Sequence, residues 1–202
     1  MLVVGFPAGP LEANCYLLAA DGGGECVIVD PGEDAVEPIE AALAEHGLTP
    51  VAMLATHGHP DHVASAAVIG ARHGIPLHLD EADRPLLVPD AGEWKDGIVP
   101  LVDGPLRLAG LEISVSRTPG HTAGSVIFGL TSAEGGRIVL TGDSLFAGSI
   151  GRSSGDGGEL VRSLGAKVMT LPDDTVVLPG HGPATTIGRE RAGNPFLAGT
   201  GV

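Results

Sequence analysis

Residues 55–62 read ATHGHPDH and place three of the chain's eight histidines within six positions. In an extended chain, side chains two residues apart point to the same side, so His57 and His59 can aim at one point. The proline that follows suits the first turn of a helix, which turns Asp61 and His62 toward a different point. This single loop therefore offers two diverging sets of metal ligands, and it favours two ions over one.

Three further donors each follow an apolar run and a tight glycine turn. TPGH presents His121, LTGD presents Asp143 and LPGH presents His181. Imidazole and carboxylate donors suit zinc, with iron or manganese as alternatives. A carboxylate has two oxygens, so Asp143 could bridge two ions while each ion keeps a position for water, as a catalytic site requires.

The other three histidines, His46, His73 and His78, lie in expected helices or a strand without partners, and we expect no metal there. The loop H-x-H-x-D-H is different, because so many polar rings beside a carboxylate would be a poor way to build a core.

The pattern around these motifs predicts an α/β fold. Turn residues separate short apolar runs, which predicts strands over 2–5, 15–19, 25–29, 51–55, 76–79, 106–108, 111–117, 125–130, 137–140 and 175–178. Helical periodicity predicts helices over 36–46, 63–73, 83–87, 159–169 and 186–191, with a loop after the third of them. Both halves run strands first and helix after, which predicts two packed sheets with helices outside.

The composition indicates one globular domain over residues 1–202, with 43% hydrophobic residues to fill its core. The formal net charge of -14 disfavours nucleic acid and anionic membranes as partners but allows a small-molecule substrate. We expect a cytoplasmic protein, because the N-terminus lacks a basic segment and no apolar run reaches membrane-spanning length. Cys15 and Cys26 form no C-x-x-C pair, so we expect buried free thiols.

The motifs THGHPDH, TPGH, TGD and LPGH resemble those of the metallo-β-lactamase superfamily, and the resemblance runs from DPG at 30–32 nearly to the chain end. It implies that superfamily's four-layer αβ/βα sandwich, in which helices flank two central mixed sheets. It also implies two metal sites bridged by Asp143: a first of His57, His59 and His121, and a second of Asp61, His62 and His181.

Within the superfamily, three segments are similar to glyoxalase II and its shorter relatives: GDSLFAGSIGR at 142–152, PGHGP at 179–183 and ERAGNPFL at 190–197. The helical region with which glyoxalase II grips glutathione would follow these, and we expect it to be missing. The resemblance therefore implies the reaction, hydrolysis of a thioester by a metal-bridged hydroxide, more firmly than the substrate. Asp61 and Asp143 would be the catalytic carboxylates, serving as ligands and holding the proton of the nucleophile.

Two residues and one loop have two interpretations each. Asp30, in the DPG turn, either orients a ligand imidazole or only forms the turn, and Thr56 is a weaker candidate for the same role. Arg152 either meets a substrate carboxylate or is a solvated surface residue. The loop 148–158 that carries it either borders the mouth of the site or is a connector.

Several other functions are compatible with the motifs. The main alternative is a persulfide dioxygenase of the same fold, with one iron on His57, His121 and Asp143 or a similar subset. A noncatalytic metal-binding protein is a further alternative. A β-lactamase is disfavoured by the expected lack of a secretion signal, a ribonuclease by the negative charge, and a diiron flavoprotein by His59, where those proteins carry Glu. The thiol of the substrate and the oligomeric state stay open.

Overall fold

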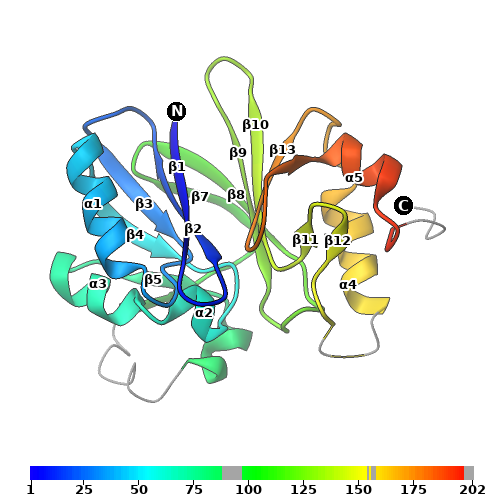
Figure 1. Cartoon of the computed structure of the whole chain (residues 1–202), viewed down its shortest axis with the longest axis horizontal. Helices are drawn as coiled ribbons and strands as arrows, with labels where there is room; N and C mark the ends of the chain where they lie inside the picture. Colours follow the sequence, from blue (N-terminus) through cyan, green and yellow to red (C-terminus); the bar gives the residue numbers. More distant parts are fainter. Residues whose placement is uncertain (88–96, 154, 156–157, 198–202) are drawn as a thin grey trace.

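A computed structural model describes residues 1–87, 97–153, 155 and 158–197, and it places helices on the outer sides of two six-stranded sheets (Figure 1). The first sheet has the order β1 (Leu2–Ala8), β2 (Ala13–Ala19), β3 (Glu25–Val29), β4 (Thr49–Leu54), β5 (Leu77–Leu79) and β6 (Ile98–Pro100). Its first three strands pair antiparallel, and β3 to β6 pair parallel.

The second sheet mixes both kinds of pairing as well. Its order is β14 (Thr185–Thr186), β13 (Val176–Pro179), β10 (Arg137–Gly142), β9 (Val126–Thr131), β8 (Leu111–Arg117) and β7 (Gly104–Leu108). Only β10 and β13 pair parallel in it. A small hairpin of β11 (Leu145–Phe146) and β12 (Ser149–Ile150) follows β10. The predicted pair of mixed sheets is confirmed.

The helices flank the sheets on their outer sides, as predicted. On the first sheet these are α1 (Val36–His46), α2 (Pro60–Val63) and α3 (Ala66–His73), and the 3-10 helix η1 (Glu81–Leu86) follows β5. On the second sheet they are α4 (Gly158–Ser163), the π-helical η3 (Leu164–Val168) and α5 (Ile187–Gly193).

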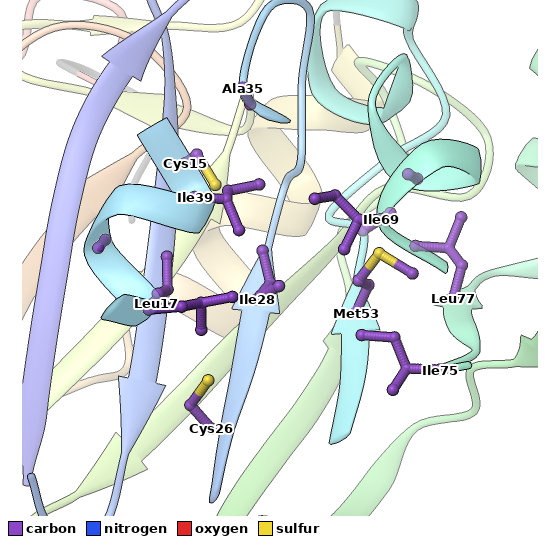
Figure 2. Close-up of a cluster of buried hydrophobic side chains, with 14 of the residues drawn as sticks. Cys15, Leu17, Cys26, Ile28, Ala35, Ile39, Met53, Ile69, Ile75 and Leu77 are labelled. Atoms are coloured by element: carbon purple, nitrogen blue, oxygen red, sulfur yellow. The ribbon is translucent and has the colours of Figure 1, made fainter. Parts of the chain in front are cut away.

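Both faces of strand β3 are buried, which explains its nearly continuous apolar sequence, ECVIV. Ile28 faces the helices, and Figure 2 shows it beside Ile39 of α1, with Met53 of β4 beside Ile69 of α3. The free thiols of Cys15 and Cys26 are buried in this same layer, as predicted.

Two further apolar layers, three in total, lie between the four layers of helices and sheets. Alternate residues of the central strands, such as Leu54, pack between the sheets against residues such as Phe128. On the outer side of the second sheet, Leu160 and Leu164 pack against Val177. The three layers bury the apolar residues that the strands present on both faces.

Some predicted boundaries were wrong. The helix predicted over 63–73 is broken at Ser65, because its N–H donates to Pro31 O and its hydroxyl accepts from Ala35 N. The helix over 159–169 turns π-helical after Ser163. The helix over 83–87 is 3-10 and begins earlier, where Asp80 caps it through Ala82 N.

Four strands, β6, β11, β12 and β14, were not predicted: β11, β12 and β14 have two residues each, too few to show a periodicity, and β6 lies in the stretch expected to be a loop. The loop was expected to run from residue 88 to residue 100. Residues 88–96 lie outside the described residues, and 98–100 form β6, which corrects that expectation. None of the described helices combines the length and apolar character that crossing a bilayer demands.

His78 is a titratable residue buried in β5, between Leu77 and Leu79. Those two leucines face the helices, so strand alternation turns His78 toward the second sheet. Burial lowers the pKa of His78 below its ordinary value of 6.5. The folded protein therefore holds this ring neutral at a pH where the unfolded chain already protonates it.

We predict that His78 makes the protein less stable in mild acid. Below pH about 6.5 the unfolded state binds the proton more readily, so the free energy of unfolding falls by up to about 1.4 kcal/mol per pH unit until the folded-state pKa is passed. The variant His78→Gln lacks this contribution. Urea unfolding of both metal-free proteins between pH 8 and pH 5 should show the wild type losing stability relative to the variant; parallel curves would contradict the burial effect.

Candidate metal centre

Strand directions bring the predicted donors to one edge of the sandwich. Strands β8, β10 and β13 run in the same direction, so the segments that carry His121, Asp143 and His181 leave the second sheet at the same edge. The loop after β4 meets them from the first sheet, where Val126 N donates to Thr56 O over 2.8 Å. All seven predicted donors come together there.

The first set of donors consists of three imidazoles. Nδ1 of His59 lies 3.1 Å from Nε2 of His57 and 3.0 Å from Nε2 of His121. A tetrahedral zinc ion with bonds of about 2.0–2.1 Å to nitrogen separates its ligands by about 3.3–3.4 Å. The three nitrogens are therefore close to the spacing that one ion requires.

The second set combines two imidazoles with a carboxylate. Nε2 of His181 lies 3.2 Å from Oδ2 of Asp61 and 3.4 Å from Nε2 of His62, and the third separation, from His62 Nε2 to Asp61 Oδ2, is 3.6 Å. Asp61 and His62 belong to α2, which begins at Pro60 as the sequence predicted. The helical turn places both in a donor group with His181.

Asp143 lies between the two sets. Its Oδ2 is 3.5 Å from Nε2 of His121 in the first set and 3.7 Å from Nε2 of His181 in the second. Its Oδ1 lies 3.3 Å from Nε2 of His62. One carboxylate is thus within reach of both sets, which is the position that a bridging ligand needs.

The donor set fits divalent cations. Oδ1 of Asp143 is buried and has no hydrogen-bond partner among the described residues. At His59, one ring nitrogen faces two other ring nitrogens, and a single proton can serve only one of these contacts. Buried donors without partners are costly, and a cation at each set would satisfy them together.

Asp30 contacts the donor loop through three hydrogen bonds. Its Oδ1 accepts from Thr56 N over 2.7 Å, and its Oδ2 accepts from Thr56 Oγ1 over 2.7 Å and from His62 Nδ1 over 2.9 Å. Because the Thr56 hydroxyl donates to Asp30, its lone pair can accept from His57 Nδ1, 3.1 Å away. Asp30 has φ 52°, an unusual value for a non-glycine residue, at the place where it makes these contacts.

Two backbone carbonyls orient the imidazoles of His121 and His181, and neither was predicted from the sequence. Nδ1 of His121 donates to Arg152 O over 2.8 Å, and Nδ1 of His181 donates to Leu11 O over 3.0 Å. These contacts leave Nε2 of each ring facing the centre. Every residue has a carbonyl, so no residue type in the sequence could have indicated them.

The glycine before His181 allows the two sets to approach each other. A Cβ atom on Gly180 would lie 2.3 Å from Asp143 Oδ1 and 2.7 Å from His62 Cε1. The Pro-Gly-His turn therefore needs glycine because its backbone runs directly against the donors.

The two sets differ in charge in the metal-free protein. Burial and the charges of neighbouring rings lower the pKa of His57 well below 6.5. Burial alone would also lower the pKa of His62, but Asp30 and Asp143 raise it to about 10. The hydrogen bond from His181 lowers the pKa of Asp61 to about 2. In the first set, His57 and His59 are thus neutral donors, whereas the second set holds ion pairs that must release protons when a metal binds.

Five of the seven donors line a cleft of about 990 Å³: His59, Asp61, His121, Asp143 and His181. The other two, His57 and His62, are buried. Apolar side chains form much of the described lining of the cleft: Leu11, Phe146, Ile150, Val161 and Phe196. The exposed Arg152 also lines it. From the loop 148–158, residues 150–153 border the cleft, while 154, 156 and 157 lie outside the described residues.

The three histidines expected to lie outside the site take part in none of the described donor groups. One detail of that expectation was wrong, because His73 has a partner, Glu40 Oε1, 3.1 Å from its Nε2.

The sequence is similar to curated proteins over nearly its whole length. A model of the metallo-beta-lactamase superfamily matches residues 8–181. The chain is 43% identical to the uncharacterized protein ML0493 of Mycobacterium leprae, covering 98% of this chain and 100% of that one. It is 36% identical to the probable metallo-hydrolase YqgX of Bacillus subtilis, with 96% of each covered, and 32% identical to the hydroxyacylglutathione hydrolase GloC of Haemophilus influenzae, with 95% of each covered.

Solved structures share this architecture. BLEG-1, titled a B3 metallo-beta-lactamase, is 34% identical with a TM-score of 0.84, covering 98% of this chain and 100% of that one. TTHA1623 in a di-iron-bound form is 37% identical with a TM-score of 0.79, covering 96% and 100%. ETHE1 from Myxococcus xanthus is 27% identical with a TM-score of 0.82, covering 98% and 85%. These likenesses agree with the predicted four-layer sandwich.

We predict that Asp30→Asn weakens metal binding by about 10–100-fold, the usual cost of losing an outer partner of a ligand. The amide places an N–H₂ group where one carboxylate oxygen now accepts, and it removes the charge that makes His62 basic. Titration of the metal-free variant with Zn²⁺ against a chelating indicator measures the loss.

Asp34→Asn is the matched control for this measurement. Asp34 is also an aspartate with positive φ, four residues further along, but its side chain is exposed. Equal Zn²⁺ affinity in Asp30→Asn and Asp34→Asn would contradict an orienting role for Asp30.

Proposed function

Since the chain belongs to the metallo-beta-lactamase superfamily, we propose that it uses two divalent cations to hydrolyse a thioester. Zinc is the preferred cation in this proposal, and iron and manganese are the alternatives. The observation that carries this proposal is the pair of complete donor sets that flank Asp143 in one cleft. The similarity to a protein named hydroxyacylglutathione hydrolase supports an acyl-thiol of the S-lactoylglutathione kind.

The residues of the proposed site have separate tasks. When bound, such cations lower the pKa of water toward ~7 and polarise a carbonyl oxygen. His57, His59 and His121 would hold the first ion, and Asp61, His62 and His181 the second. Asp143 would contact both, and the carboxylates of Asp61 and Asp143 would accept the proton of the attacking water. Asp30 and the carbonyl of Arg152 keep imidazoles in orientation.

The chemistry of the leaving group favours a thioester over an amide. A thiol has a pKa of about 8.5, so it leaves as a thiolate with little help from a general acid. Among the described residues that line the cleft, the only carboxyl groups are Asp61 and Asp143, which are already assigned as ligands. An amine leaving group, as in a β-lactam, would need a proton donor.

The cleft also supports a substrate of mixed character. Its apolar lining suits the carbon skeleton of an acyl or thiol group, and Arg152 can meet a carboxylate on the substrate. Glutathione, another small thiol and coenzyme A all satisfy this description in part. We therefore propose a thioester as the bond that is cleaved and leave the thiol open.

The alternative, a mononuclear-iron persulfide dioxygenase of the same fold, needs only one ion. Here the second set, of Asp61, His62 and His181, is assembled as well, with 3.2–3.6 Å between its donor atoms. A complete second set favours hydrolysis by two ions.

We predict that Asp143→Ala loses metal and thioesterase activity together. The substitution removes the carboxylate that both sets share, so turnover of S-lactoylglutathione should fall by about 100-fold or more, beyond the cost of losing an outer partner. Metal content by mass spectrometry and loss of the thioester absorbance measure the two effects on the same samples.

Asp174→Ala is the control, because Asp174 is an exposed acid that pairs with Arg137. Wild type loaded with two ions that cleaves no thioester would overturn the proposal. Cleavage of a chromogenic β-lactam instead, or oxygen uptake with glutathione persulfide and one iron per chain, would replace it with the corresponding function.

A further inference from the structure

Asp83 is a buried acid on η1 that takes no part in the donor sets described above. The residue is only 1% exposed, and its carboxylate accepts three hydrogen bonds. Oδ2 accepts from Gly58 N over 2.9 Å and from Thr122 Oγ1 over 2.6 Å, and Oδ1 accepts from Gly124 N over 2.7 Å. Both oxygens of the carboxylate therefore accept hydrogen bonds.

The partners of Asp83 adjoin the ligands of the first set. Gly58 lies between His57 and His59, and Thr122 follows His121 directly. The loop with Gly58 leaves the first sheet after β4, whereas the loop with Thr122 leaves the second sheet after β8. One carboxylate thus ties together two loops from opposite sheets that must place three imidazoles around one ion.

Packing at both loops is as close as the hydrogen bonds suggest. A Cβ atom on Gly58 would lie 2.7 Å from Asp83 O, and one on Gly124 would lie 2.7 Å from Asp83 Cγ. Neither loop has space to shift toward η1. The three hydrogen bonds and the close packing therefore set the same distance between η1 and the two loops.

A second link holds η1 itself in place. Asp80 caps its first turn through Ala82 N over 2.9 Å and forms a bidentate ion pair with Arg117. Arg117 ends β8, so it begins the segment that leads to His121. Asp80 is fully buried, so its ion pair with Arg117 is a strong link between the two sheets.

We propose that Asp83 is a positioning residue that sets the distance between His57, His59 and His121 and so the affinity of the first ion. The inference rests on the proposed two-ion site. It is selective, because the hydrogen bonds described for Asp83 lead to neighbours of the first set, and none leads to Asp61, His62 or His181.

The test is a titration of metal-free protein with Co²⁺ and Zn²⁺ that resolves the two equivalents. In Asp83→Asn, one acceptor oxygen becomes an N–H₂ group that faces a donor, so one equivalent should bind about 10–100-fold more weakly while the other is unchanged. The Co²⁺ absorption bands of the weakened equivalent should shift, because its three imidazoles no longer keep their geometry. Thr122→Val, which removes one donor and leaves Asp83 intact, should act in the same direction and more weakly.

Glu190→Gln is the matched control. Glu190 is also a buried acid that accepts three hydrogen bonds, from Gly148 N, Thr185 Oγ1 and Asn194 Nδ2, but its partners adjoin none of the donors. It should lower thermal stability as Asp83→Asn does, without changing the affinity or the Co²⁺ spectrum of either equivalent.

Three outcomes would overturn the inference: equal weakening of both equivalents, no weakening in Asp83→Asn and Thr122→Val, or the same weakening in Glu190→Gln. In a His181→Ala background, which lacks a ligand of the second set, Asp83→Asn must still weaken the remaining ion. Wild type that binds two ions but cleaves no thioester would refute the proposed function alone, because the titration does not depend on turnover.

Discussion

The rest of this structure depends on one constraint: metal-ligating nitrogen and oxygen atoms lie close together, with too few protons to form hydrogen bonds between them. Ring nitrogens stand 3.0–3.1 Å apart in the first set, and a buried oxygen of Asp143 has no hydrogen-bond partner among the described residues. Such groups repel one another or lose hydration unless a cation joins them. The scaffold has to hold them in place, and three apolar layers across two sheets supply the rigidity.

Buried acids transmit that rigidity to the loops. Asp30, Asp83 and Glu190 each accept three hydrogen bonds, and those of Asp83 join loops that leave the two different sheets. Part of the acidic composition, 25 Asp and Glu residues against 11 Lys and Arg, therefore serves the interior. Burial keeps the ring of His57 neutral, whereas the carboxylates of Asp30 and Asp143 raise the pKa of His62.

Much of the fold could be predicted because its signals are local. Strand β3 is apolar on both faces, and α1 shows a helical stripe that ends at a glycine, so both were found. The hairpin β11–β12 was not, because strands of two residues exist only through their partners. The helix over 63–73 was predicted without its break, since the two bonds of Ser65 that interrupt it reach segments some thirty residues away.

The sequence by itself determined which side chains carry metal chemistry, because imidazole and carboxylate donors are defined by residue type and their turns by glycine. It also determined that the loop 57–62 points two ways, since strand and helix direct side chains differently. Only the tertiary structure decided what holds those donors: the carboxylate of Asp83 and the carbonyls of Leu11 and Arg152. Such contacts join residues far apart in the chain, and a carbonyl is common to all residues, so no local pattern encodes them.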